Sequence, residues 1–107
     1  MSYDVHLEAD LGCGPVRVGD LDSNMTWNIA PIVVAACGTS PSQWDGLTGA
    51  EVCALARKVA DAIDAEPNKY RALNPPNGWG SAETCQRWMR GIAWACAGAP
   101  NATFRVH

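Results

Sequence analysis

The chain has 107 residues, of which 48% are hydrophobic and 18% are charged, and its formal net charge is −3. This composition argues against disorder, and a chain of this length can bury roughly two thirds of its unfolded surface in one core. We therefore expect a single α+β domain over residues 1–107. Because the charge is negative and no cluster of Lys and Arg reverses it locally, we expect no nucleic acid as a partner.

The apolar segments and the cysteines indicate the cellular compartment in which we expect the protein. The longest apolar run, residues 29–37, is interrupted by Pro31 and is too short to span a bilayer. The N-terminal residues lack the basic and apolar segments of a signal peptide. Five cysteines form no CxxC pair: Cys13, Cys37, Cys53, Cys85 and Cys96. We therefore expect free thiols in a reducing cytoplasm, and no membrane as a partner.

The first quarter of the sequence predicts two strands. In residues 3–9, apolar side chains alternate with polar ones, which is typical of a strand with one buried face. We expect His6 on the solvated face of this strand, among its carboxylates. After a Gly-rich turn, residues 16–18 predict a short second strand, and residues 20–24 predict a loop.

Three helices are predicted after these strands. Asn28 is a candidate N-cap for a helix over residues 29–37. A Thr-Gly-Ala-Glu capping box opens a second helix over residues 48–65, and the polar loop before it contains Trp44. A third helix over residues 81–97 begins at a serine and ends before a Gly and a Pro.

The third helix has the clearest apolar stripe, and we expect this face in the core: Cys85, Trp88, Met89, Ile92 and Cys96. Residues 103–106 predict a closing strand, whose expected partner is the first strand. The order of elements is then β-β-α-α-α-β. We predict an α+β fold in which a small, mostly antiparallel sheet carries helices packed on one face.

The segment before the third helix is the most distinctive of the chain. Residues 70–80 include Asn-Pro-Pro-Asn-Gly-Trp-Gly, whose prolines and turn-forming Asn-Gly pair fix one backbone shape. If this segment meets residues 24–28, aromatic and amide side chains would line a pocket for a small polar ligand: Trp27, Asn28, Asn77 and Trp79. The alternative is that each asparagine serves only a cap or a turn.

One face of the third helix is a candidate partner-binding surface. Trp94 lies opposite the apolar stripe, and Arg87 and Arg90 precede it in the sequence. Arg90 could stack on the Trp94 ring, and both residue types are favoured at protein interfaces. The alternative is that another helix or the loop containing Trp44 covers Trp94.

No pattern typical of catalysis or metal binding stands out. The two histidines lie near opposite ends of the chain and no cysteine pair has ligand spacing, so we expect no metal and no cofactor. A thiol site formed by Cys13 and His6, or a carboxylate site formed by Asp4 and Glu8, is an alternative without a sequence signature. We therefore predict that the protein is not an enzyme.

Several segments resemble a group of small uncharacterised proteins of actinobacteria and their phages. They are Trp-Asn-x-x-Pro at residues 27–31, Asp-Gly-Leu-Thr-Gly at 45–49, residues 70–80 with Asn-Pro-Pro-Asn-Gly-Trp-Gly, and the closing segment at 100–106. The resemblance spans nearly the whole chain and implies a phage-borne gene, but no catalytic residue. Our leading hypothesis is a small cytoplasmic interaction protein that binds a host protein. The alternative is a small-ligand binding domain, and the sequence leaves homodimer formation open.

Overall fold

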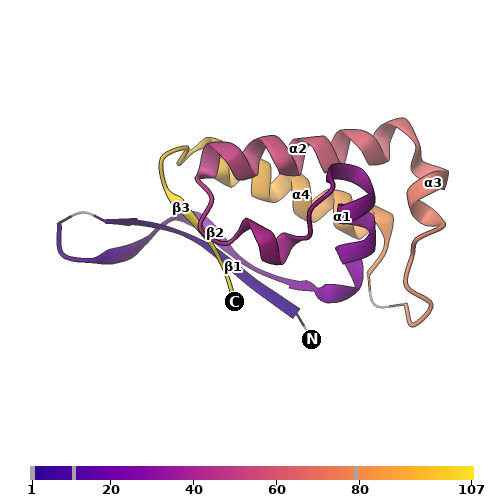
Figure 1. Ribbon diagram of the computed structural model, residues 1–107, viewed down its shortest axis with the longest axis horizontal. Helices are drawn as coiled ribbons and strands as arrows, with labels where there is room; N and C mark the ends of the chain where they lie inside the picture. The colour runs from indigo at the N-terminus through magenta and orange to yellow at the C-terminus, as the bar shows by residue number, and fades with distance from the viewer. Residues whose placement is uncertain (1, 11, 79) are drawn as a thin grey trace.

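The computed structural model of the protein describes residues 2–10, 12–78 and 80–107. A layer of helices covers one face of a small sheet, and the hairpin of the first two strands extends beyond the helices (Figure 1). The three strands of the described chain pair antiparallel. The predicted fold, an α+β arrangement with helices on one face of a small antiparallel sheet, is confirmed.

The sheet has the order β2-β1-β3, so that β1 (Ser2–Asp10) lies between β2 (Pro15–Thr26) and β3 (Thr103–Val106). The predicted pairing of the first and last strands is confirmed, with Val5 opposite Val106. The alternating apolar residues in the first part of β1 are buried, as their pattern predicted. The core therefore lies on the helix side of this central strand.

Strand β2 is much longer than its sequence predicts. The expected loop at residues 20–24 is wrong, because β2 continues through these residues. The register shifts between His6 and Leu7 of β1, which leaves residues 19–21 as a bulge that begins at Gly19, where φ is 72°. Pairing with β1 outweighs the low strand propensity of the Asp, Ser and Asn residues in this segment.

Helix α1 (Ala30–Cys37) follows a 3-10 turn, η1 (Trp27–Ile29). The prediction that Asn28 caps this helix is wrong, because Asn28 lies inside the turn and its Nδ2 donates to Thr26 Oγ1 at 3.2 Å. An N-cap needs extended backbone, and the 3-10 turn removes it at this position. Gly38 ends the helix with φ at 87°, in the left-handed region that glycine adopts without strain.

Trp44, which the sequence places in a polar loop, is completely buried. It ends a second 3-10 helix, η2 (Pro41–Trp44), and its Nε1 donates to Thr39 Oγ1 at 2.9 Å. Its ring lies 6.4 Å from the ring of Phe104. The loop folds inward because the large indole is stabilised by burial once its polar N–H has an acceptor.

Helix α2 (Gly49–Ala65) begins at the predicted capping box. Thr48 Oγ1 accepts a hydrogen bond from Glu51 N at 3.2 Å, and Thr48 N donates to Glu51 Oε1 at 3.3 Å. These two bonds satisfy backbone donors that have no partner inside the helix. A short helix, α3 (Pro67–Arg71), follows directly.

Helix α4 (Ala82–Ala97) lies alongside α2 and is capped by Ser81, whose Oγ accepts from Thr84 N at 3.1 Å. Most of its predicted stripe is buried: Cys85, Met89, Ile92 and Cys96. Trp88 is the exception, because it lies at the edge of the stripe and is only partly buried. Its partly buried side chain lines a neighbouring pocket.

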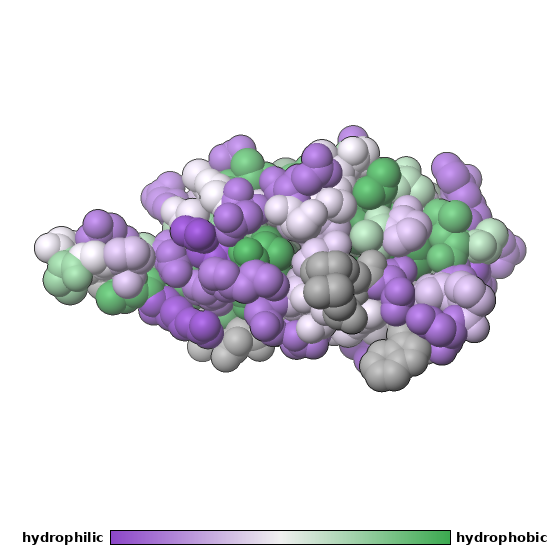
Figure 2. Space-filling view, turned by 60° about the horizontal axis from the view of Figure 1, so that its bottom comes forward, coloured by the Kyte–Doolittle hydropathy of each residue, from purple (hydrophilic) through white to green (hydrophobic). Residues whose placement is uncertain are grey.

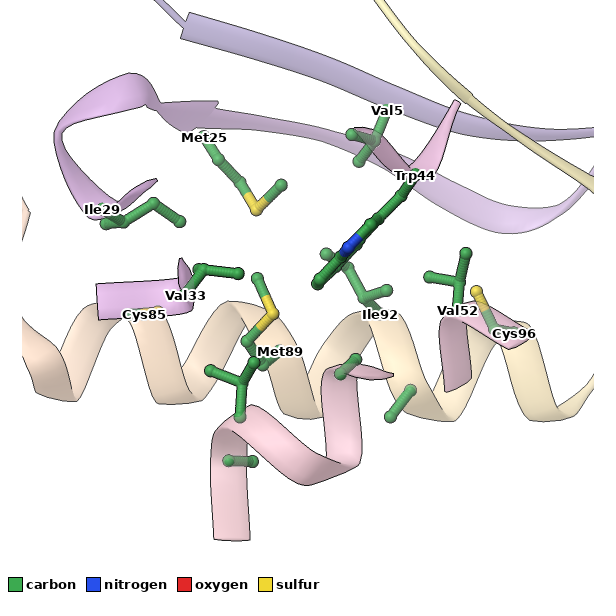
Figure 3. Close-up of a cluster of buried hydrophobic side chains, with 14 of the residues drawn as sticks. Val5, Met25, Ile29, Val33, Trp44, Val52, Cys85, Met89, Ile92 and Cys96 are labelled. Carbon is green, nitrogen blue, oxygen red and sulfur yellow. The ribbon is translucent and has the colours of Figure 1, made fainter. Parts of the chain in front are cut away.

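Figure 3 shows the core between the sheet and the helices. Met25 from β2, Val33 from α1 and Trp44 from η2 point toward the side chains of α4. These side chains point toward Met89 and Ile92 of α4, which are almost completely buried. The end of β2 is thus held against the middle of α4, which positions the segment that follows it.

Candidate functional site

A pocket of about 730 Å³ lies where the end of β2 and η1 meet the loop that leads into α4. In Figure 1 these two segments approach each other below α1, although they are far apart in the sequence. The polar lining comes from three asparagines and three hydroxyl residues: Asn24, Asn28, Asn77, Ser2, Thr26 and Thr84. The pocket therefore presents amide and hydroxyl groups.

Gly80 lets the two segments approach closely. Its φ is +101°, and a Cβ on this residue would lie 3.0 Å from Thr26 Cγ2 and 3.1 Å from Ile29 Cγ2. Glycine suits both the backbone conformation and the short contact, because it has no Cβ. The shape of the pocket therefore depends on the missing side chain at this position.

The amide groups of Asn24 and Asn28 are only partly engaged within the described part of the chain. Asn28 Nδ2 donates to Thr26 Oγ1, which leaves its second amide hydrogen and its Oδ1 without a partner among the described residues. Asn24 Nδ2 donates to Ser2 Oγ at 2.9 Å and to Asp4 Oδ1 at 2.6 Å, so its Oδ1 is the atom left open within the described chain. The pocket thus offers both donors and acceptors.

Helix α4 forms the opposite wall of the pocket. Thr84 and Trp88 lie one turn apart on the same side of this helix, and both line the pocket. Thr84 Oγ1 is 3.0 Å from Ser81 Oγ, which fixes the orientation of the hydroxyl. The partly buried indole of Trp88 adds an apolar surface beside these polar groups.

The structure brings Asn28 and Asn77 of the sequence-predicted ligand set to the same pocket. Trp79 lies outside the described residues, and so does the side chain of Trp27. Sequence reasoning missed the contributions of Thr84 and Trp88 from α4, because Trp88 has the spacing of the core stripe. That these residues bind a ligand stays a prediction.

The predicted partner-binding residues lie on the outer side of α4. Trp94 is 74% exposed, so the elements of the described chain leave most of its ring uncovered, and Arg87 and Arg90 are also exposed. The predicted stacking of Arg90 on Trp94 is wrong, because Arg90 Nη2 instead pairs with Asp64 Oδ2 of α2 at 2.8 Å. Trp94 borders a hollow of about 480 Å³ that also touches Gly19 of the β2 bulge.

The outer face of the sheet carries a network of charged groups, and Figure 2 shows hydrophilic residues gathered on this side. The prediction that His6 is solvated is wrong, because only 4% of it is exposed. His6 Nε2 shares a hydrogen bond with Glu8 Oε1 at 2.8 Å, and its ring stacks on that of His107, with 5.1 Å between centroids. Arg105 lies between Glu8 and Asp45, with its Nε 2.9 Å from Asp45 Oδ1.

This network lowers the pKa of two carboxyl groups. The hydrogen bond from Val106 N, at 2.9 Å, is the main reason that the pKa of Asp45 is lowered, and Arg105 lowers it further. The hydrogen bond from His6 is the main reason that the pKa of Glu8 is lowered. The lowered pKa favours the ionised form of Asp45, and this carboxylate accepts the hydrogen bond from the backbone of β3.

The thiols are spread over different environments. Cys13 is exposed in the turn between β1 and β2, while His6 lies further back along β1 and contacts Glu8 and His107, so the structure does not bring Cys13 and His6 together. Cys53, Cys85 and Cys96 are buried, and burial was predicted for Cys85 and Cys96 as members of the apolar stripe. Burial raises the pKa of the Cys85 and Cys96 thiols to about 12.

Within residues 2–10, 12–78 and 80–107, no group of three or more His, Cys, Asp or Glu side chains could hold a metal ion. None of the helices in these ranges combines the length and the apolar character that a bilayer crossing requires.

Comparison of the chain with protein-family models, with curated proteins and with solved structures finds no match. The function must therefore be inferred from the geometry of the pocket and of the exposed helix face.

Proposed function

We propose that this protein is a binding domain for a small polar molecule, which occupies the pocket between η1 and α4. The observation that carries the proposal is the lining of the pocket, in which amide and hydroxyl groups converge beside the ring of Trp88. Ligand sites in proteins are commonly concave, have volumes of roughly 300–1,000 Å³ and use a few oriented polar groups beside an aromatic surface. A pocket of about 730 Å³ fits this description.

The pocket is also preorganised, which supports the proposal. Asn74 Oδ1 accepts from Ala82 N at 2.8 Å and so attaches the proline-containing loop to the start of α4. Gly80 packs directly against η1. A site that is already formed binds its ligand without the entropic cost of ordering a loop.

Ligand-observed NMR with a library of small neutral, cationic and anionic compounds tests the proposal. We expect some members to bind the wild-type protein and to lose binding in the Trp88→Ala variant. Trp94→Ala is the matched control, because it removes the same side chain from the exposed side of the same helix. If no compound binds in a manner that depends on Trp88, the proposal is wrong.

The exposed side of α4 supports a second proposal, that the protein binds a protein partner through Arg87, Arg90 and Trp94. The observation that favours it is the 74% exposure of Trp94, because a large exposed aromatic residue beside arginines is typical of interface hot spots. The resemblance to phage proteins suggests a bacterial host protein as the partner. No catalytic activity is part of either proposal.

The same two variants separate the two proposals. Tagged wild-type protein should capture a partner from an actinobacterial lysate, and the purified partner should bind wild type and Trp88→Ala with equal affinity. Trp94→Ala should weaken this affinity by about tenfold or more, as expected for a hot-spot residue. Equal binding by Trp94→Ala would remove this face of α4 from consideration.

A further inference from the structure

We infer that the pocket takes an uncharged, polyhydroxylated ligand with one apolar face, of the chemical class of a pyranose sugar. This inference rests on the binding function proposed above and specifies its ligand class. It is carried by three features of the described pocket: its lack of charge, the state of the adjacent helix end, and the combination of hydrogen-bonding groups with an indole ring.

The lining of the pocket carries no ionisable side chain among the described residues. A cation in the lining would offset the desolvation of a phosphate or carboxylate ligand, and a carboxylate would do so for an amine. The nearby Asp4 already accepts a hydrogen bond from Asn24 at 2.6 Å, and Glu83, at the start of α4, pairs with Arg71 at 2.5 Å. Both of these carboxylates thus have a partner within the protein.

The N-terminus of α4 borders the pocket, but two of its backbone donors are already used. Ala82 N donates to Asn74 Oδ1 at 2.8 Å, and Thr84 N donates to Ser81 Oγ at 3.1 Å. A helix N-terminus attracts anions through free N–H groups, and two of the N–H groups in this first turn are bonded within the protein instead.

Hydroxyl groups match the atoms that the pocket leaves open. A ligand hydroxyl is both a donor and an acceptor, so it can donate to an amide oxygen while it accepts from an amide hydrogen. Asn28 offers both kinds of atom, and Asn24 offers its Oδ1, in each case with no partner in the part of the chain that the structure describes. Several adjacent hydroxyls on one ligand would use these groups together.

Trp88 supplies the complementary apolar surface. The face of an indole ring is electron-rich, so it attracts the weakly positive C–H groups that line one face of a pyranose ring. The ring of Trp88 is partly buried at the edge of the core, which holds it in place while it lines the pocket. A ligand with hydroxyls around its rim and C–H groups on one face fits both parts of the site.

Isothermal titration calorimetry with matched sugars tests the inference. The panel holds neutral hexoses and disaccharides, and for each ring the uronic acid, the amino sugar and the sugar phosphate. We expect saturable binding of neutral members and weaker binding of their charged counterparts. Trp88→Ala should weaken binding by about tenfold or more, whereas Trp94→Ala should leave it unchanged.

A second variant, Asn28→Ala, guards against loss of fold in Trp88→Ala, because it should weaken neutral-sugar binding while the melting temperature stays near that of wild type. Tighter binding of a charged member, with dependence on Trp88, would overturn the inference but leave the proposed function standing. The same holds if no sugar binds while compounds of the mixed library do. If neither the sugars nor the library bind, both the inference and the proposed function are wrong.

Discussion

Gly80 lies against Thr26 so closely that a Cβ on Gly80 would be 3.0 Å from Thr26 Cγ2. This contact joins the end of β2 to the loop before α4. In the sequence, helices α1, α2 and α3 lie between these two segments. The contact leaves no space for a side chain at position 80. It therefore sets the distance between the end of β2 and the loop before α4, which both line the candidate pocket.

Gly80→Ala tests this contact. The substitution forces an alanine into φ near +101° and pushes its Cβ against Thr26 and Ile29. We expect the free energy of unfolding to fall by about 1–3 kcal/mol, as measured by urea denaturation. Gly91→Ala is the control, because a Cβ on Gly91 in α4 would meet no atom within 4 Å, and it should raise stability by about 0.5–1 kcal/mol. Equal effects of the two variants would contradict this explanation.

Trp44→Ala should remove the largest fully buried side chain of the described chain. The cavity, together with the lost hydrogen bond to Thr39, should lower the free energy of unfolding by about 3–5 kcal/mol. Trp94→Ala should change it by less than about 0.5 kcal/mol, because the ring is mostly exposed. Chemical denaturation of both variants gives the comparison, and a Trp44→Ala protein as stable as wild type would show that burial of this indole contributes little to stability.

The buried thiols should make the protein less stable at high pH. Burial raises the pKa of Cys85 and Cys96 to about 12 in the folded state, whereas an unfolded cysteine has a pKa of about 8.5. Between these values the unfolded state has released protons that the folded state retains, so stability falls as pH rises. The free energy of unfolding, measured from pH 8 upward, should fall more steeply in wild type than in Cys85→Ala.

Cys13→Ser is the control for this slope, because it removes an exposed thiol. It should reproduce the wild-type dependence on pH. Thiol labelling adds an independent measurement. In the native protein a labelling reagent should modify Cys13 quickly, and should modify Cys85 and Cys96 only as fast as the protein unfolds.

Asp45 should give the opposite dependence at low pH. Its pKa is lowered in the folded state, chiefly by the hydrogen bond from Val106 N, so its contribution is present above the unfolded pKa of about 3.9. This contribution is lost as pH falls through the lower folded value. In Asp45→Asn the acid limb of the stability curve should be shallower than in wild type. An acid limb as steep in Asp45→Asn as in wild type would contradict this explanation.

Local signals in the sequence predicted the helices well. The capping box at Thr48 and the cap at Ser81 fix the starts of α2 and α4, because these side chains satisfy specific backbone donors. Strand β2 was predicted poorly, since its polar second half is ordered by pairing with β1 and not by its own propensity. His6 was misplaced because the ring that covers it, His107, lies at the far end of the sequence.

The candidate pocket shows the same division. Asn28 and Asn77 could be proposed from the sequence, because turn-rich segments with amides and aromatic neighbours are typical of ligand sites. The role of Trp88 could not be proposed from the sequence, because Trp88 belongs to the same apolar stripe as the core residues Cys85 and Ile92. Only packing decides which member of such a stripe lies at the edge of the core.

The pairing of Val5 with Val106 has a consequence for the folding kinetics. The hairpin of β1 and β2 needs only a short loop closure, whereas β3 must find β1 across almost the entire polypeptide, which carries the larger entropic cost. We therefore expect refolding to end with the docking of β3. Substitutions along that strand would then accelerate unfolding while hardly changing the rate of refolding.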